Sequence, residues 1–316
     1  MKSIRSKHGR RQRQKKKSFV RVVGVLLSIL AICLACFLYI NRANLIGKEK
    51  QATNITSSQT SSSVSTSSTT ETSNSTSETS TEIAWEKQAE PVKVPILMYH
   101  AIHVMAPEES ANANLIVDPT TFESQLQALQ NAGYYTLTPE EAYKVLTENV
   151  LPAGKKVVWL TFDDSLWDFY DIAYPILKKY NIKATNNVIT GRTENGTAGH
   201  LTLEQLKEMQ SNGMSFQGHT VTHPDLEYST VEAQTTELQN SKAYLDTNLN
   251  QNTLAVAYPA GRYSADTLSI AESSGYKLGV TTNEGLASAS NGLLSLNRVR
   301  ILPTTTPEVL LQTIAQ

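Results

Sequence analysis

Short apolar runs alternate with helical patterns from Pro91 to the end of the 316-residue chain, and this alternation most limits the possible fold. Runs such as "VPILMY" (Val94 to Tyr99) and "KVVWLTF" (Lys156 to Phe162) are typical of buried strands. Because repeated strand-then-helix units build a parallel sheet, the pattern predicts an α/β fold. Seven or eight such units in about 225 residues predict a (β/α) barrel that is distorted or incomplete.

The individual elements follow from local signals. Asp118 and Pro119 are typical of a helix start, and Thr138, Pro139 and Glu141 form the pattern of a capping box. Helices are therefore expected to start at residues 119 and 139, and further ones near residues 170–180, 203–209, 230–248, 265–273 and 306–315. Strands are expected at residues 94–99, 134–137, 156–162, 182–190, 214–218, 254–258, 277–281 and 298–301.

Polar side chains gather where these expected strands end. Such positions are His100 after the first strand, Asp163 and Asp164 after the third, His219 and His223 after the fifth, and Tyr258 and Pro259 at the sixth. In a (β/α) barrel the carboxyl ends of the strands converge on one mouth, where active sites are built. Residues scattered over about 160 positions can therefore meet in one pocket.

The adjacent carboxylates of Asp163 and Asp164 need a stabilising partner, since two like charges repel each other and are costly to bury unpaired. His219 and His223 are four residues apart, and two solvent-exposed loop histidines are the usual explanation for such a pair. Together with one aspartate they would instead form an Asp-His-His set, which leaves room for water and substrate as catalytic zinc sites require. The second aspartate would then lie close enough to act as a general base.

These residues resemble the motifs of the polysaccharide deacetylases of carbohydrate esterase family 4, in particular their membrane-anchored cell-surface branch. "TFDD" (Thr161 to Asp164) is similar to the first motif of that family, and "HTVTH" (His219 to His223) to the second. The resemblance spans roughly residues 95–301 and includes the entry strand "VPILMYH". It implies that Asp163 is the catalytic base. It also implies that Asp164, His219 and His223 bind a divalent metal, most often zinc.

The third motif of the family, R-x-P-Y, is matched only by "AYPA". Ala257 stands where an arginine would orient the base, and we expect the missing charge to come from Arg262, Arg298 or Arg300. The backbone N–H of Ala260 can still contribute to an oxyanion hole, because that role needs no side chain. The segment expected to form the oxyanion hole and the substrate groove consists of Tyr258, Pro259 and Ala260.

The fifth motif, L-x-x-H, supplies the general acid in the family, but "LLSLNRVRI" contains no histidine. His100 is the candidate substitute; the alternative is a histidine that is bonded to a carboxylate and only supports the site. Aromatic side chains near the motifs could stack on sugar rings or belong to the core; they are Trp159, Trp167, Tyr258 and Tyr263.

The segment before the barrel has a different composition. Residues 1–21 contain ten Lys or Arg and no acid, and residues 22–40 form an uncharged apolar run long enough to cross a membrane. The positive-inside rule places the N-terminus in the cytoplasm and the rest outside. A cleaved signal peptide, or a lipoprotein anchor at Cys33 or Cys36, is the alternative. Ser and Thr make up 22 of the 30 residues 52–81, which predicts a disordered linker over residues 41–90 before a catalytic domain at residues 91–316.

The expected activity is metal-assisted removal of N-acetyl groups from a surface glycan of a Gram-positive cell. The candidate substrates are the N-acetylglucosamine residues of peptidoglycan or of poly-N-acetylglucosamine. The alternatives are a non-catalytic carbohydrate-binding surface protein on the same fold and an esterase for O-acetyl sugars. The domain has a charge balance of −10 over residues 85–316, and no nucleic-acid partner is expected. The expected partners are the glycan and the membrane, with a single span and an extracellular domain.

Overall fold

The computed structural model describes residues 83–315. The basic segment, the apolar span and most of the Ser/Thr-rich linker that we expect from the sequence lie outside this range. Among the described residues, none of the helices combines the length and the apolar character needed to cross a membrane.

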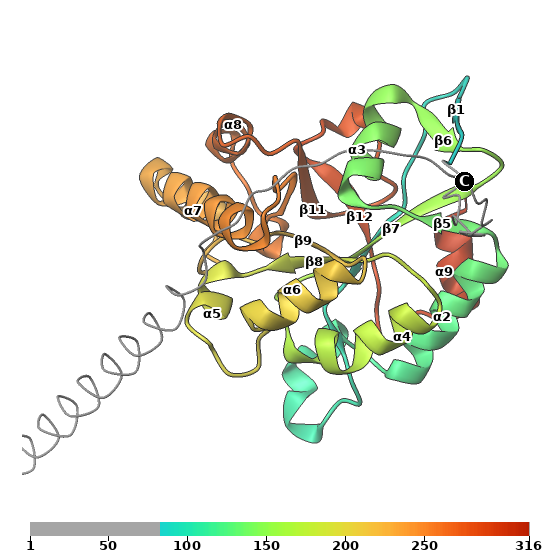
Figure 1. Cartoon of the computed structure of the whole chain (residues 1–316), viewed down its shortest axis with the longest axis horizontal. Coiled ribbons are helices and arrows are strands. Elements are labelled where there is room, and N and C mark those ends of the chain that lie inside the picture. Colours follow the sequence, from blue (N-terminus) through green and yellow to red (C-terminus); the bar gives the residue numbers. More distant parts are fainter. Residues whose placement is uncertain (1–82, 316) are drawn as a thin grey trace, which may run out of the picture. The chain divides into compact units, whose positions relative to one another are not determined.

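Seven parallel strands form a closed barrel (Figure 1). In chain order they are β2 (Ile96–Tyr99), β7 (Lys156–Phe162), β8 (Thr185–Val188), β9 (Ser215–Gly218), β10 (Ala255–Ala257), β11 (Leu278–Glu284) and β12 (Leu296–Arg300). Around the barrel the order is β2, β12, β11, β10, β9, β8 and β7, and β7 pairs again with β2. The predicted (β/α) barrel is therefore confirmed.

The distortion of the barrel arises at β7, which pairs with two strands along the same edge. Its first residues pair with β5 (Tyr134–Thr136), in the register Tyr134 to Lys156. Its last residues pair with β2, in the register Ile96 to Trp159. An eighth strand is thus present, but it adds to β7 without taking part in the closed ring.

Helices surround the barrel and connect its strands (Figure 1). They are α2 (Pro119–Asn131), α3 (Pro139–Glu148), α4 (Tyr174–Lys179), α5 (Thr190–Glu194), α6 (Leu203–Ser211), α7 (Val231–Leu249), α8 (Ala265–Ser273) and α9 (Pro307–Thr313). A π-helical turn, η2 (Phe169–Ala173), precedes α4, and 3-10 helices form η1 (Pro107–Leu115), η3 (Leu226–Tyr228), η4 (Pro259–Gly261) and η5 (Ala289–Asn291). The capping box at Thr138 is present, since its side chain accepts from Glu141 N–H and Glu141 accepts from Thr138 N–H.

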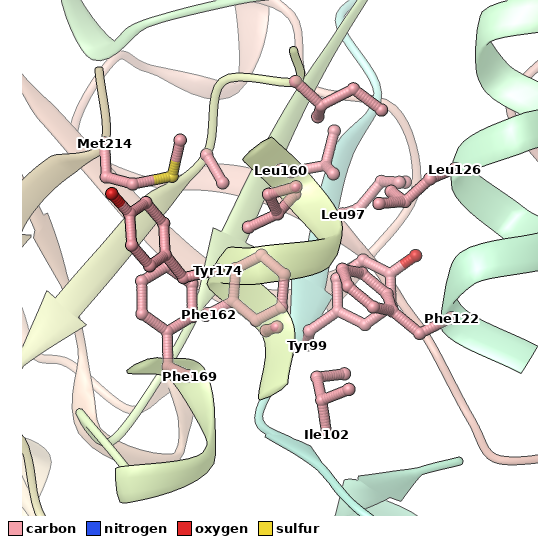
Figure 2. Packing of buried hydrophobic residues seen from close by; sticks show 14 of the residues in the cluster. Leu97, Tyr99, Ile102, Phe122, Leu126, Leu160, Phe162, Phe169, Tyr174 and Met214 are labelled. Atoms are coloured by element: carbon pink, nitrogen blue, oxygen red, sulfur yellow. The ribbon is translucent and has the colours of Figure 1, made fainter. Parts of the chain in front are cut away.

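Alternating side chains of β7 point into two separate cores. Val158, Leu160 and Phe162 pack outward against the helices, in a cluster that also contains Tyr99 from β2 and Phe122 from α2 (Figure 2). The inner face carries Val157 and Trp159 near its start, and the polar residues Thr161 and then Asp163 follow. The barrel interior therefore changes from apolar to polar toward the carboxyl ends of its strands.

A strand lies before residue 91, where we expect the domain to start. Strand β1 (Trp85–Lys87) pairs antiparallel with β6 (Val150–Pro152). The Trp85 ring also meets Tyr135 edge to face at 6.5 Å, and the Lys144 ammonium lies 4.9 Å from its centre. The sequence prediction that these residues belong to the linker is wrong, because a three-residue strand is too short to give a periodic signal. A second short pair, β3 (Ala101–Ile102) with β4 (Ile116–Val117), was not predicted either.

Candidate active site

Asp163 continues the inward face of β7 and is almost fully buried. Arg298 from β12 binds it with two parallel hydrogen bonds, from Nη1 to Oδ1 at 2.9 Å and from Nη2 to Oδ2 at 2.7 Å. Asn187 from β8 donates a third, from Nδ2 to Oδ1 at 2.7 Å. Side chains from two other strands of the barrel thus fix the carboxylate, and Oδ2 keeps one acceptor position free of protein donors among the described residues.

The Arg298 guanidinium is the partner that stabilises one of the two adjacent aspartates. Burial alone would raise the pKa of Asp163, but the positive charge of Arg298 outweighs it and holds that pKa well below its usual range. Arg298 itself is completely buried, so this is an internal ion pair. The other two arginines that could have filled the role bind elsewhere: Arg262 pairs with Asp225 at 2.6 Å, and Arg300 approaches Glu284 at 3.9 Å.

Asp164, His219 and His223 come together at the mouth of the barrel. One ligand atom from each lies within 4.8 Å of the others. Asp164 Oδ1 is 3.3 Å from His219 Nε2 and 3.5 Å from His223 Nε2. Asp164 has a φ of 76°, which turns its side chain away from the alternation of β7, so that it is partly exposed while Asp163 is buried. The three residues expected as a metal-binding set therefore form one cluster.

The proton positions in this cluster suit a cation. His219 Nδ1 lies 2.7 Å from the carbonyl oxygen of Ala257, which can only accept, so Nδ1 carries the hydrogen. In neutral His219, Nε2 is then a bare lone pair that faces the Asp164 carboxylate. Burial would lower the pKa of His219, but Asp164 and Asp163 outweigh it and raise that pKa, so the position favours positive charge. His219 Nε2 and the Asp164 carboxylate are thus two acceptors that face each other, and the hydrogen bond to Ala257 O fixes the orientation of the His219 ring. This arrangement fits a divalent metal.

The loop that carries both histidines is held in an unusual conformation. Thr220 and His223 have φ values of 63° and 65°, in the left-handed region that residues with a side chain rarely adopt. Glu237 from α7 stabilises this turn, since its Oε2 accepts from the N–H groups of Val221 at 2.7 Å and Thr222 at 2.8 Å. Its Oε1 accepts from the Thr222 hydroxyl at 2.6 Å. Sequence reasoning missed Glu237, because nothing in a helical pattern distinguishes this acid from the others on the same helix.

We expect Glu237→Ala to weaken metal binding by about 10- to 100-fold, the range found when groups that orient metal ligands are removed. Loss of the carboxylate leaves two N–H groups of the strained turn without acceptors, so His223 loses its fixed position. Glu232→Ala is the matched control, because Glu232 lies on the same helix and its side chain forms no hydrogen bond or ion pair with the loop among the described residues. Titration with zinc and a competing chelator measures the change; equal affinities in both variants would contradict the role of Glu237.

Helix α5 supports the same loop from the other side. Thr190 N–H donates to Thr220 O at 3.1 Å, and Gly191 N–H donates to Val221 O at 2.9 Å. A Cβ atom on Gly191 would lie 2.7 Å from that carbonyl oxygen, so only glycine allows this close approach. The turn with the histidines is therefore fixed between α5 and α7.

His100 lies beside the buried carboxylate, with its Nε2 4.0 Å from Asp163 Oδ2. Burial lowers the pKa of His100, and the charges of Asp163 and Asp164 oppose that shift only in part. The imidazole is thus mostly buried at the strand end where we expected it. His103 binds Asp168 and Glu109 through its two ring nitrogens.

The segment Tyr258–Pro259–Ala260 has a different arrangement from the one we expected. The Tyr258 side chain is fully buried between the barrel and the helices, where its hydroxyl donates to Leu294 O at 2.9 Å. It therefore cannot line a substrate groove, and that part of the prediction is wrong, because the strand alternation directs it outward from the barrel. Pro259 is also buried, whereas Ala260 is exposed and has a φ of 52° in the tight turn η4.

A cavity of about 290 Å³ opens next to the cluster. Its lining residues are Asp164, Leu166, Ile189, Arg192, His200, Thr222 and His223. Two of the three candidate metal ligands, Asp164 and His223, thus line this cavity.

A (β/α) barrel with an Asp-His-His cluster and a second, buried carboxylate at its mouth has the residues that hydrolases of the metal-assisted class use. Comparison with known proteins identifies the family within this class. Residues 150–279 match the model of the polysaccharide deacetylase family. The YxkH protein of Bacillus subtilis is 44% identical over 220 residues, which are 70% of this chain and 75% of that protein. The chain therefore belongs to the polysaccharide deacetylase family, and its enzyme class is that of the polysaccharide N-deacetylases.

Two further relatives illustrate the range of the family. The Streptococcus pyogenes deacetylase PplD, solved in complex with acetate, is 67% identical, with a TM-score of 0.70 over 72% of this chain and 100% of that chain. The poly-beta-1,6-N-acetyl-D-glucosamine N-deacetylase of Staphylococcus epidermidis is 32% identical over 183 residues, which are 54% of this chain and 63% of that protein.

Proposed function

We propose that this protein removes N-acetyl groups from N-acetylglucosamine residues of a cell-surface polysaccharide, with peptidoglycan as the first candidate and poly-N-acetylglucosamine as the second. The observation that carries the proposal is the pairing of an Asp-His-His cluster with a separately fixed carboxylate one residue away. The match to deacetylases, one of them named for poly-beta-1,6-N-acetyl-D-glucosamine, supports the same reaction.

Each residue at the barrel mouth has a separate role in the proposed reaction. Asp164, His219 and His223 would hold a divalent metal, for which we propose zinc, since two imidazoles and a carboxylate are common zinc ligands. Such a metal, when bound, polarises the acetyl carbonyl and makes water more acidic. Asp163 accepts the proton of the attacking water at Oδ2, the oxygen with the free acceptor position. Arg298 keeps Asp163 ionised, and with Asn187 it holds the carboxylate in one orientation.

The remaining roles belong to Ala260 and His100. The Ala260 N–H lies in the exposed turn after β10, where it can donate to the developing oxyanion. His100 donates a proton to the departing sugar amine, since no other imidazole outside the metal cluster approaches Asp163 among the described residues. Burial lowers the pKa of His100, so its protonated form is a stronger acid but makes up a smaller fraction near neutral pH.

The non-catalytic alternative loses one of its two sequence arguments. It rested on Ala257 in place of an arginine and on the missing histidine of the fifth motif. Arg298 supplies the guanidinium from a different strand, so the base keeps its partner. His100 is the proposed replacement for the missing histidine.

Acetate release from peptidoglycan and from poly-N-acetylglucosamine tests the proposed function. The purified full-length protein should release acetate from at least one polymer, should lose this activity after treatment with a chelator, and should regain it with zinc. Release from O-acetylated but not from N-acetylated glycans would make the protein an esterase. Glycan binding with no acetate release from any of these substrates would favour the non-catalytic alternative.

A mutation of His100 tests the general acid. We expect His100→Ala to reduce the rate on N-acetyl substrates by about 10² to 10⁴-fold, the range typical of lost acid catalysis, with metal content unchanged. The same variant should lose much less activity on an activated O-acetyl ester, because that leaving group departs without protonation. An equal loss on both substrates would assign His100 a supporting role.

We also propose that residues 22–40 anchor the protein in the membrane as a single span and that the residues between this span and β1 act as an extracellular linker. The ten basic residues before the apolar run support this orientation. Such an anchor would keep the catalytic domain close to the cell wall, which favours peptidoglycan as the substrate.

A further inference from the structure

An exposed tryptophan stands close to the candidate active site. Trp167 follows Asp164 by three residues and Leu166 of the cavity lining by one. It is 43% exposed, although tryptophan is usually well buried. Of the four aromatic residues that could stack on sugars, Trp159 and Tyr258 are fully buried, and Tyr263 packs against Tyr258 at 5.3 Å. Trp167 alone among these four presents a large open surface.

The Trp167 ring is held by a stacking neighbour and by its backbone. The imidazole of His103 stacks on it, with ring centres 5.8 Å apart and planes inclined by 26°. The N–H of Trp167 donates to Gly199 O at 3.0 Å, which connects its backbone to the segment beside the cavity. An exposed indole with one face covered and its backbone held is a rigid surface, so it loses little conformational freedom when a ligand binds.

A buried carboxyl group fixes His103 in turn. Its Nδ1 lies 2.6 Å from Oδ2 of Asp168, a completely buried carboxylate that also accepts from Ile102 N–H at 2.7 Å. Its Nε2 lies 3.1 Å from Glu109. Burial of a carboxylate is costly unless it is paired, and here the pairing fixes the imidazole that supports the exposed indole. Val104 and Met105, which follow His103 in the chain, are also exposed and add apolar surface next to it.

We propose that Trp167 is a stacking platform for a pyranose ring that neighbours the sugar undergoing deacetylation. This inference rests on the proposed function and identifies a second sugar-binding subsite. A β-linked N-acetylglucosamine ring is uncharged and has its polar substituents near the ring plane and C–H groups on its faces, so it can cover an indole without unpaired polar groups. A neutral ring is the expected occupant, because His103 and its two carboxylates already bind one another.

Tryptophan fluorescence tests the platform without any need for turnover. The chain has three tryptophans, of which Trp159 is fully buried, and a Trp85→Phe variant removes the other one outside the site. The chelator-treated Trp85→Phe protein should change its emission when titrated with an N-acetylglucosamine tetramer. The Trp85→Phe/Trp167→Phe protein should show no change, although calorimetry should still detect binding.

Affinity measurements complete the test. Trp167→Ala should raise the tetramer Kd about tenfold, whereas Trp167→Tyr should stay within about threefold of the original protein. Tyr228→Ala is the matched control, since Tyr228 is 80% exposed and has no ring partner among the described residues. An unchanged tetramer Kd in Trp167→Ala would overturn the proposed stacking role of Trp167, even if the protein is an active deacetylase. A Trp167-dependent Kd in a protein without deacetylase activity would retain the platform and reject the proposed function.

Discussion

Replacing Asp163 with asparagine should slow deacetylation by about 10² to 10⁴-fold while the metal stays bound. The amide keeps the shape of the side chain and can accept hydrogen bonds from Asn187 and Arg298, but it cannot take a proton from water. Asp164→Asn should behave differently, because Asp164 points into the Asp-His-His cluster and its loss lowers metal affinity together with activity. Acetate release and metal content of both variants provide the measurement.

The comparison of these two variants separates a base from a ligand. Asp163→Asn must be measured well below its unfolding temperature, since it also removes the counterion of buried Arg298. Equal metal loss in both variants would show that the two aspartates share the metal. Full activity of the Asp163→Asn variant would show that Asp163 is not the catalytic base.

Replacing Arg298 with methionine should lower the free energy of unfolding by about 3 to 5 kcal/mol. The substitution keeps much of the side-chain volume but leaves the carboxylate of Asp163 buried without its cation. Urea unfolding of the purified protein measures the loss. Arg300→Met is the matched control, because Arg300 lies on the same strand, is partly exposed and only approaches Glu284, so its loss should cost less than about 1 kcal/mol.

A double substitution tests whether the two charges are coupled. Asp163→Asn combined with Arg298→Met should be less destabilising than the sum of the single changes, because no buried charge then remains unpaired. Additive losses, or an Arg298→Met variant as stable as Arg300→Met, would contradict the account of this ion pair.

Much of the fold could be predicted from local patterns. Strands such as β7 and helices such as α2 and α7 lie within a few residues of their expected positions. Their signals are apolar periodicity and helix caps, which act between neighbours in the chain and therefore stand in the sequence itself. The short pairs of β1 with β6 and of β3 with β4 lack such signals, since two or three residues cannot show a period.

The sequence by itself determined the strand ends from which Asp163, Asp164, His219 and His223 project, because parallel strands of a barrel bring their carboxyl ends to one mouth. Only the tertiary structure decided which arginine serves Asp163. Arg298 is 135 residues away, and it reaches the carboxylate because β12 and β7 both pair with β2. The tertiary structure also decided the role of Glu237, the burial of Tyr258 and the exposure of Trp167. Packing between distant segments sets the exposure and the partners of a side chain, and these cannot be predicted from the neighbouring residues in the sequence.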